Sequence, residues 1–578
     1  MSLHNLSAQM EKHSVISFDF FDTLFLRKLE EPETVFDLVG HHFKISDFRV
    51  LRKKAQQLAF IEMHSNKKHE INIDDIYNNF HELNELQKQQ VKNYEVKIEL
   101  DVICPNWEII DLYLNAIKLG KQVVITSDMY LTEDYFIKAL NKFSLPIVKL
   151  FISADKDCTK RDFGNLFDMV IASTNAKASD ILHIGDNLLA DVHKAHLKGL
   201  SAYHYESMFS SQRRNVDISE SITNGLINSR INKFPDDSGE KFAYQYGGPT
   251  VVGFQRWLQK VTKGDKIDAL FYLARDGYMI KKFSERNKGS FCSKELYFKG
   301  SRTSFILSSI TEANFSEHIP YFLSGAYELS VHEIFERIGV SAPAQTVLDD
   351  LGFTESIAIK NQSYKNIYNL LHSMKKNILN VCRENRRGLH QLLVELNLPA
   401  DANIGLVDVG WKGSTQDAFE NAIRPFFEYN VHGYYFCLLG SVGNNKKAMV
   451  DSAIYGKEII NKIYANRVAF ELIFSAPHET VIGHIPDSNK IKFIEDQRRT
   501  KTHNFFMPLE KGMNLFFDEY DEFSFNIDFT PSTQALIQPL VNFAVSEEWK
   551  NNKYISYIQN FDAWSATENI TFLPSQYS

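Results

Sequence analysis

Acidic side chains follow apolar runs at two places in the first part of the chain. Asp19 and Asp22 come directly after the apolar residues 15–18. Asp186 and Asp191 follow a second apolar run in the same way. A buried parallel strand ends in this manner where its carboxyl edge carries chemistry. The simpler alternative is a strand followed by an Asp/Thr turn that caps a helix.

Two hydroxyls and a lysine occupy similar positions after other apolar runs. The run 122–125 ends in Thr126 and Ser127, and the run 148–152 is followed by a polar loop that contains Lys160. Side chains of these types can donate hydrogen bonds to an anion and neutralise its charge. Taken alone, Lys160 would be interpreted as a solvated loop residue, so its significance depends on the other polar residues.

Helical patterns alternate with these apolar runs, which predicts a parallel sheet with helices on both faces. In such sheets ligands bind beyond the carboxyl ends of the strands, where all of these polar residues are expected. A mainly helical stretch separates the first strand from the others, and we expect it to form a cap from about residue 28 to about residue 115. The alternative is a helical subdomain without a gating role.

About the first 205 residues resemble the haloacid dehalogenase (HAD) superfamily, whose members are mostly phosphatases and phosphotransferases. Four motifs are matched in order, by Asp19 and Thr23, by Ser127 or Thr126, by Lys160, and by Gly185, Asp186 and Asp191. The resemblance implies a Rossmannoid parallel sheet with a helical cap inserted after the first motif. This expectation agrees with the alternation of strands and helices and with the helical insert.

The same resemblance implies a phosphoryl-transfer site. Asp19 is the expected nucleophile, which would form an aspartyl-phosphate. Mg²⁺ would bring carboxylate and phosphate together, held by Asp19, by the backbone carbonyl of Phe21 and by Asp186. Asp191 would be a further ligand or would orient Asp186.

Two further roles in this site are implied by the resemblance. Ser127 would donate a hydrogen bond to a phosphoryl oxygen, with Thr126 as the alternative hydroxyl in contact with the substrate. Lys160 would neutralise the charge that develops on the phosphoryl group.

The sequence departs from the superfamily pattern at Phe21. This position usually holds a second carboxylate, the general acid/base, whose absence typically removes a rate contribution of about 10²–10⁴-fold. Three explanations stay open. Asp22 takes the role, although on an extended strand it would face the other way. Otherwise the leaving group needs no proton, or the domain is slow or inactive and binds a phosphorylated ligand.

The first domain is expected at 1–207, a linker at 208–240 and a second α/β domain at 241–578. Two of its predicted strands end in polar clusters, with Arg275 and Asp276 after one and Asp408, Lys412, Gly413, Ser414 and Thr415 after the other. A Gly-Ser-Thr turn at a helix N-terminus can bind an anion, and carboxylates can bind a metal or ribose-like hydroxyls. The alternative is that these residues only cap turns. The pattern is loosely similar to that of phosphoribosyltransferases.

The chain as a whole is similar to large bacterial HAD proteins associated with surface polysaccharide synthesis. With 578 residues it is too long for one hydrophobic core. A net charge of −8 provides no general attraction to nucleic acid or anionic membranes. Five scattered cysteines without a CxxC pair predict neither a disulfide framework nor a zinc site. Neither a transmembrane run nor a secretory signal is found, so a cytoplasmic location is expected.

These observations favour a Mg²⁺-dependent phosphohydrolase or phosphotransferase that acts on a small phosphorylated metabolite, such as a sugar phosphate or a nucleotide sugar. A second hypothesis is a catalytically weak HAD domain that serves as a regulatory module, with Phe21 as its supporting feature. In a third, the C-terminal domain is the main enzyme, a transferase. The sequence leaves the substrate and the oligomeric state open.

Overall fold

The computed structural model describes residues 3–206, 216–286, 292, 294–324, 326, 329–354, 358–440, 443, 445–488, 490–496, 502–546, 548–557, 559–560 and 570–571. The chain forms two compact units. The first comprises Met1–Pro235 and Asp518–Ala535, and the second comprises Asp236–Phe517 and Leu536–Ser578. Among the described helices, none combines the length and the apolar character needed to cross a membrane.

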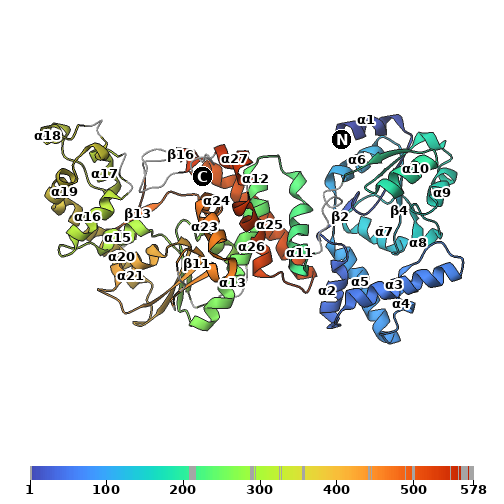
Figure 1. The fold of residues 1–578 in the computed structure, drawn as a ribbon, viewed down its shortest axis with the longest axis horizontal. Coiled ribbons are helices and arrows are strands. Elements are labelled where there is room, and N and C mark those ends of the chain that lie inside the picture. Colours follow the sequence, from blue (N-terminus) through green and yellow to red (C-terminus); the bar gives the residue numbers. More distant parts are fainter. Residues whose placement is uncertain are drawn as a thin grey trace. The chain divides into compact units, whose positions relative to one another are not determined.

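A five-stranded parallel sheet forms the centre of the first unit (Figure 1). Its strands lie in the order β5 (Lys149–Ile152), β4 (Gln122–Ser127), β1 (Val15–Phe18), β6 (Ile181–Gly185) and β7 (Ser201–His204). All neighbouring strands are parallel. The chain extends the sheet from β1 through β4 to β5 and then returns to add β6 on the other side of β1. We call the boundary between β1 and β6 the first switch point.

Helices cover both faces of this sheet because the side chains of β1 alternate between them. Val15 packs with apolar residues of α9 (Asn165–Thr174) and α10 (Lys194–Leu197). Phe18, on the opposite face, contacts the ring of Tyr113 in α6 (Trp107–Lys118). The other helices of this part are α1 (Leu3–Lys12), α7 (Glu133–Lys142), α8 (Ser153–Lys156), η1 (Ala178–Asp180) and η2 (Leu188–His193).

A group of four helices is inserted after β1, in blue in Figure 1. It consists of α2 (Thr34–Phe43), α3 (Phe48–Ser65), α4 (Ile73–Asn78) and α5 (Glu85–Val102), which pack on one another. The chain enters and leaves this group through the antiparallel pair β2 (Phe25–Arg27) and β3 (Ile103–Pro105). The inserted helices therefore span 34–102, a shorter stretch than the predicted 28–115, since α6 packs on β4 in the sheet layer.

Part of the expected linker is packed structure. α11 (Ile218–Asn228) and η3 (Ile231–Lys233) belong to the first unit, whereas residues 207–215 lie outside the described residues. The hydroxyl of Ser221 in α11 accepts a hydrogen bond from the Thr34 hydroxyl at 2.7 Å. Gly225 approaches the chain so closely that a Cβ there would lie 2.2 Å from the backbone nitrogen of Leu29. Only a glycine allows α11 to pack at this distance.

The second unit contains its own five-stranded parallel sheet. Its strands lie in the order β12 (Lys446–Val450), β11 (Asn430–Leu438), β10 (Asn403–Trp411), β8 (Ala269–Leu273) and β9 (Lys294–Phe298). The order in which the chain adds strands reverses between β8 and β10, and we call this boundary the second switch point. The predicted fold class, an α/β chain with a second α/β sheet region, is confirmed.

The remaining elements surround the second sheet or follow it in the chain. Between β9 and β10 the chain forms a helical group at residues 315–373, which packs around an apolar cluster that also includes Leu307, Ile310, Ile378 and Cys382. The helices are α12 (Gly239–Phe242), η4 (Ala243–Gly247), α13 (Gly248–Asp265), α14 (Tyr278–Ser284), α15 (Arg302–Ser309), α16 (Phe315–Leu323), α17 (Val331–Ile338), α18 (Gln345–Asp350), η5 (Ile359–Asn361), α19 (Tyr364–Ser373), α20 (Lys375–Glu395), α21 (Ser414–Ile423), α22 (Ser452–Tyr455), α23 (Lys457–Ala465), α24 (Arg467–Ile473), α25 (Thr502–Asn526), α26 (Thr533–Val545), η6 (Glu548–Asn551) and α27 (Lys553–Tyr557). The antiparallel pairs are β13 (Val481–Asp487) with β14 (Lys490–Glu495) and β15 (Gln559–Asn560) with β16 (Ile570–Thr571).

Candidate active site

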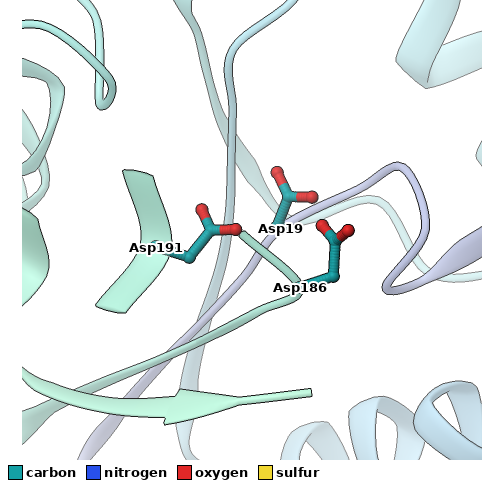
Figure 2. Close-up of side chains that lie close together, drawn as sticks. All are labelled: Asp19, Asp186 and Asp191. Carbon is teal, nitrogen blue, oxygen red and sulfur yellow. The ribbon is translucent and has the colours of Figure 1, made fainter. Parts of the chain in front are cut away.

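Three carboxylates meet at the first switch point, as Figure 2 shows. Asp19 directly follows β1 and Asp186 directly follows β6, and these strands pair in parallel with Phe18 opposite Ile184. Asp191 reaches the same place from η2. Each aspartate offers a carboxylate oxygen, and these oxygens lie within 4.8 Å of one another. The structure thus brings together three residues that were predicted as metal ligands.

Lys160 lies between two of these acids. Its Nζ is 2.7 Å from Oδ1 of Asp19 and 2.5 Å from Oδ1 of Asp191. Its side chain is only 3% exposed. Since a buried ammonium is costly unless it is paired, the two carboxylates hold the lysine in place and the lysine reduces their repulsion. The polar loop after β5 therefore delivers Lys160 into the site.

The loop that carries Lys160 is held by Asp128, a residue to which the sequence analysis assigned no role. Its carboxylate accepts hydrogen bonds from the backbone N–H of Lys160 at 2.8 and 3.0 Å and from that of Arg161 at 2.9 Å. The sequence did contain a pattern for this residue, because Asp128 directly follows the strand-end hydroxyl of Ser127.

Asp191 is fixed by donors on both of its oxygens. Besides Lys160, Nε2 of His183 lies 3.1 Å from Oδ1, and the backbone N–H of Asn187 donates to Oδ2 at 2.9 Å. The chain at Gly185 passes very close to this side chain, since a Cβ there would lie 2.3 Å from Cγ of Asp191. Asp191 is therefore a preformed anchor for Lys160.

Of the two strand-end hydroxyls, only Ser127 lines the pocket over these acids. Thr126 is fully buried, and its Oγ1 lies 2.8 Å from Oγ of Ser17 inside the sheet. Successive side chains of a strand point to opposite faces, so the two neighbours cannot both face the pocket. Thr126, which was predicted to contact the substrate, thus lies inside the sheet and not among the residues that line this pocket.

The chain turns sharply after β1, and this turn decides where Asp22 lies. Its backbone N–H donates to the carbonyl of Phe25 at 2.8 Å, and its φ of 55° is in the left-handed region. As a result Asp22 lines the same pocket as Asp19. The expectation that Asp22 faces away was wrong, because it assumed an extended strand.

Phe21 is packed as a core side chain at the edge of this pocket. It is 9% exposed, and its ring lies 6.0 Å from that of Tyr135. The Arg27 guanidinium lies 4.0 Å from the ring centre of Phe21 and forms an ion pair with Glu99 at 3.3 Å. A cation over an aromatic face is favourable, especially where water is excluded. Phe21 is thus held in place by aromatic and cation–π contacts.

The acids differ in how firmly each holds a proton. Burial, partly offset by Lys160, raises the pKa of Asp19 to about 7. Burial and the neighbouring carboxylates raise the pKa of Asp186 to about 8. Burial also acts on Asp191, but Lys160 outweighs it and holds the pKa of Asp191 well below its usual range. When both are ionised, the carboxylates of Asp19 and Asp186 repel one another, and a bound cation would remove this repulsion.

The residues at the first switch point fit a divalent cation. Within the described part of the chain, the side chain of Asp186 forms no hydrogen bond or ion pair, whereas both oxygens of Asp191 are engaged. Carboxylate oxygens are the ligands that Mg²⁺ prefers in proteins. Asp19 and Asp186 are thus the side chains able to hold such an ion, and Asp191 is better suited to positioning Lys160.

A pocket of about 900 Å³ opens over the carboxylates. Its wall includes Arg161, which pairs through both terminal nitrogens with the buried Glu70 of the helical insert, at 2.8 and 2.9 Å. Arg161, His204 and Glu206 line the pocket and were not predicted. Arg161 could have been found from its place beside Lys160, but no pattern in the sequence pointed to His204 or Glu206.

The other predicted substrate-binding residues belong to the second unit. Arg275, Asp276, Lys412, Gly413, Ser414 and Thr415 follow the strands β8 and β10 of the second sheet. The structure thus divides the predicted residues between the carboxyl edges of two different sheets.

Neither a protein-family model nor a curated protein matches the chain. Among solved structures it is similar to a dehalogenase, at 11% identity and a TM-score of 0.25, over 36% of this chain and 91% of that one. It is also similar to the putative HAD-hydrolase YfnB from Bacillus subtilis, bound to magnesium, at 18% identity and a TM-score of 0.27, over 34% of this chain and 96% of that one. A HAD family enzyme from Bacteroides thetaiotaomicron matches at 13% identity and a TM-score of 0.27, over 34% of this chain and 95% of that one.

Proposed function

We propose that the first unit is a Mg²⁺-dependent phosphohydrolase or phosphotransferase acting on a small phosphorylated metabolite. The observation that supports this most directly is the arrangement of Asp19, Lys160 and Asp186 at the first switch point. Asp19 lies 2.7 Å from the buried ammonium of Lys160, and its carboxylate is close to that of Asp186. A nucleophilic carboxylate, a fixed cation and a second oxygen ligand are the groups that phosphoryl transfer through an aspartyl-phosphate requires.

In the proposed first step, a carboxylate oxygen of Asp19 forms a bond to phosphorus while the bond from phosphorus to the leaving oxygen breaks. Lys160 and the Ser127 hydroxyl would face the phosphoryl oxygens as negative charge develops on them. Water then attacks phosphorus and releases phosphate and the Asp19 carboxylate. Bound Mg²⁺, held by Asp19, Asp186 and the backbone carbonyl of Phe21, would offset the repulsion between carboxylate and phosphate.

We assign the acid/base role to Asp22. The left-handed turn that places Asp22 at the pocket supports this assignment. Asp22 would give a proton to the leaving oxygen in the first step and take one from the attacking water in the second. Phe21 keeps the place that this group usually occupies closed to water.

For the ligand, a sugar phosphate or a nucleotide sugar is the leading candidate. The pocket volume of about 900 Å³ is in the range of small-molecule sites. The sequence resemblance to two-domain proteins associated with surface polysaccharide synthesis favours the same ligands.

The proposal is tested by hydrolysis of p-nitrophenyl phosphate by the full chain, with and without Mg²⁺. We expect Mg²⁺-dependent turnover that Asp19→Asn abolishes and Asp22→Asn lowers by about 10²–10⁴-fold. Asp168→Asn is the matched control, because Asp168 lies on α9 with its side chain 53% exposed and pairs with Lys198. Full turnover by Asp22→Asn would exclude Asp22 as the acid/base.

A second candidate function is a phospholigand-binding regulatory module, favoured by the core packing of Phe21. In that case the unmodified chain would bind vanadate or inorganic phosphate only with Mg²⁺ and show no turnover. Asp186→Asn would then abolish this binding, whereas Asp168→Asn would leave it unchanged.

A further inference from the structure

The second switch point is built like the first. In the second unit the chain passes from β8 to β9 on one side and later returns to place β10 on the other side of β8. The parallel register sets Val407 of β10 opposite Tyr272 of β8, so Asp408 lies at the carboxyl end of the paired region. Asp276 follows β8 at the same edge. A crevice at such a boundary is the usual ligand site of a doubly wound sheet.

Two acids meet at this edge, the buried Asp408 and the partly exposed Asp276. The charge of Asp408 is one cause of the raised pKa of Asp276, so the two carboxyl groups interact across the switch point. Asp408 is 6% exposed, and its Oδ2 has no hydrogen-bond partner in the described part of the chain. A buried carboxylate oxygen without a donor leaves desolvation uncompensated. A ligand hydroxyl would supply the missing hydrogen bond.

The proton state of this pair suits hydroxyl groups. Burial and the neighbouring Asp408 raise the pKa of Asp276 well above its usual range. A raised pKa favours the neutral, protonated carboxyl group of Asp276. A neutral ligand group that both donates and accepts can bind here without the cost of burying a further charge.

The N-terminus of helix α21, at the same edge of the sheet, favours an anion. Helix α21 starts directly after β10, and no side chain caps its N-terminus at Gly413. Lys412 directly precedes Gly413, and Arg275 follows β8, the strand that pairs with β10. The ammonium of Lys446 lies 3.1 Å from the Gly413 carbonyl oxygen. An uncapped helix N-terminus with cationic side chains nearby attracts phosphate groups.

We propose that the carboxyl edge of the second sheet is a second ligand site, which binds a phosphorylated sugar. The Asp276–Asp408 pair receives its hydroxyl groups, and the N-terminus of α21 receives its phosphate together with Arg275 and Lys412. The site consists of residues of the second unit alone, so it does not depend on the function proposed for the first unit.

The test is calorimetric titration of the full chain, carrying Asp19→Asn to prevent turnover, with glucose 1-phosphate and with ribose 5-phosphate. Inorganic phosphate and glucose are the half-ligand probes. We expect a sugar phosphate to bind at least tenfold more tightly than either half-ligand. Asp408→Asn and Arg275→Ala should each weaken that binding at least tenfold.

Two controls keep the outcomes distinct. Glu458→Gln removes an exposed carboxylate of α23 that pairs with Lys462, and it should leave binding unchanged. Asp186→Asn alters only the first switch point and should also leave this binding in place. Arg275 is partly exposed, so Arg275→Ala should retain the melting temperature even if Asp408→Asn does not.

Three results would overturn the proposal. One is that neither sugar phosphate binds at concentrations up to about 10 mM, which corresponds to the weakest Kd expected for such a site. Another is binding that Asp186→Asn abolishes and Arg275→Ala leaves unchanged, which would assign it to the first unit. The third is inorganic phosphate binding as tightly as the sugar phosphates, which would reduce the site to a simple anion site.

Discussion

Asp186 and Asp191 look equivalent in the sequence, but their oxygens have different surroundings. Both oxygens of Asp191 receive hydrogen bonds, from Lys160 and His183 on one and from a backbone N–H on the other. The side chain of Asp186 has no such partner in the described part of the chain. A residue already saturated with donors positions its neighbours, whereas an unsaturated carboxylate is available to a metal.

This difference predicts separate effects of the two substitutions. Asp186→Asn should weaken Mg²⁺ binding at least tenfold, since it removes a charged ligand. Asp191→Asn should lower kcat at least tenfold while changing the Mg²⁺ affinity by less than about threefold, since it releases Lys160. Mg²⁺ titration calorimetry and p-nitrophenyl phosphate kinetics measure the two quantities. Equal losses of Mg²⁺ affinity in both variants would contradict the assignment.

Within the helical insert, one buried charge network holds the helices together. Arg52 of α3 is fully buried and forms two hydrogen bonds with Glu95 of α5, at 2.9 and 2.8 Å. The Tyr77 hydroxyl donates to the same carboxylate at 2.7 Å. The guanidinium also lies 5.0 Å from the ring centre of Tyr130, which follows β4. The network thus joins the insert to the sheet that it covers.

Removing one partner of this network should be costly. Glu95→Leu leaves the buried guanidinium of Arg52 without a counter-charge, and we expect a loss of about 3–5 kcal/mol in the stability of the first unit. Thermal unfolding followed by calorimetry measures it. Glu82→Gln, which breaks the exposed pair with Lys54, is the control and should change stability by less than about 1 kcal/mol. A similar small change for Glu95→Leu would refute this role.

The stability of the second unit depends on pH through the buried residue His484. His484 in β13 is fully buried, and its Nε2 lies 2.6 Å from the Lys299 carbonyl oxygen, which fixes the proton on that nitrogen. Burial lowers the pKa of His484 to about 4. Because the unfolded pKa is near 6.5, the unfolded chain binds the extra proton first as pH falls. The neutral imidazole therefore stabilises the second unit above about pH 6.5, and this stability is lost toward pH 4.

We expect the second unit to lose up to about 3 kcal/mol between pH 7 and pH 4 through this one residue. His484→Gln keeps a donor for the Lys299 carbonyl and removes the titration, so its stability should depend less on pH. Urea unfolding at several pH values measures the slope. His390→Gln, at an exposed position of α20, should keep the slope of the unmodified chain. An unchanged slope in His484→Gln would contradict the prediction.

On the scale of the molecule, the first unit is not continuous in sequence. It takes residues 518–535 from near the end of the chain. Ile527 of this segment is 1% exposed, and the backbone N–H of Ser532 donates to the hydroxyl of Ser219 in α11 at 3.0 Å. Glu519 pairs with Arg230. The first unit therefore requires α11 and this distant segment to bury its apolar surface.

A fragment of residues 1–207 should consequently be less stable than one of residues 1–235. Without α11 the shorter fragment exposes the apolar surface that Ile222 and Leu226 cover, both of which are fully buried in the whole chain. We expect a melting temperature lower by at least about 2–4 °C, the effect of roughly 1 kcal/mol in a domain of this size, and stronger binding of an apolar dye. Equal melting temperatures and equal dye binding would show that α11 is dispensable.

The local patterns of the sequence were sufficient for much of the first unit. The strands ending at Asp19, Ser127 and Asp186 and the loop of Lys160 could be predicted because buried parallel strands are apolar runs with polar ends. The position of Asp22 could not, because a single left-handed residue reverses the face expected from alternation. The partners of Asp191 also escaped prediction, since hydrogen bonds between distant segments leave no periodic pattern.

By itself, the sequence determined the alternation of strands and helices, the carboxylates at the strand ends and hence the kind of chemistry available to them. Only the tertiary structure decided which strands are neighbours. It placed Asp19 beside Asp186, separated Thr126 from the pocket, and built a second edge around Asp276 and Asp408. The reason is that hydrophobic periodicity is a property of residues close together in the sequence. Strand order instead depends on how whole layers of helices and strands pack on one another.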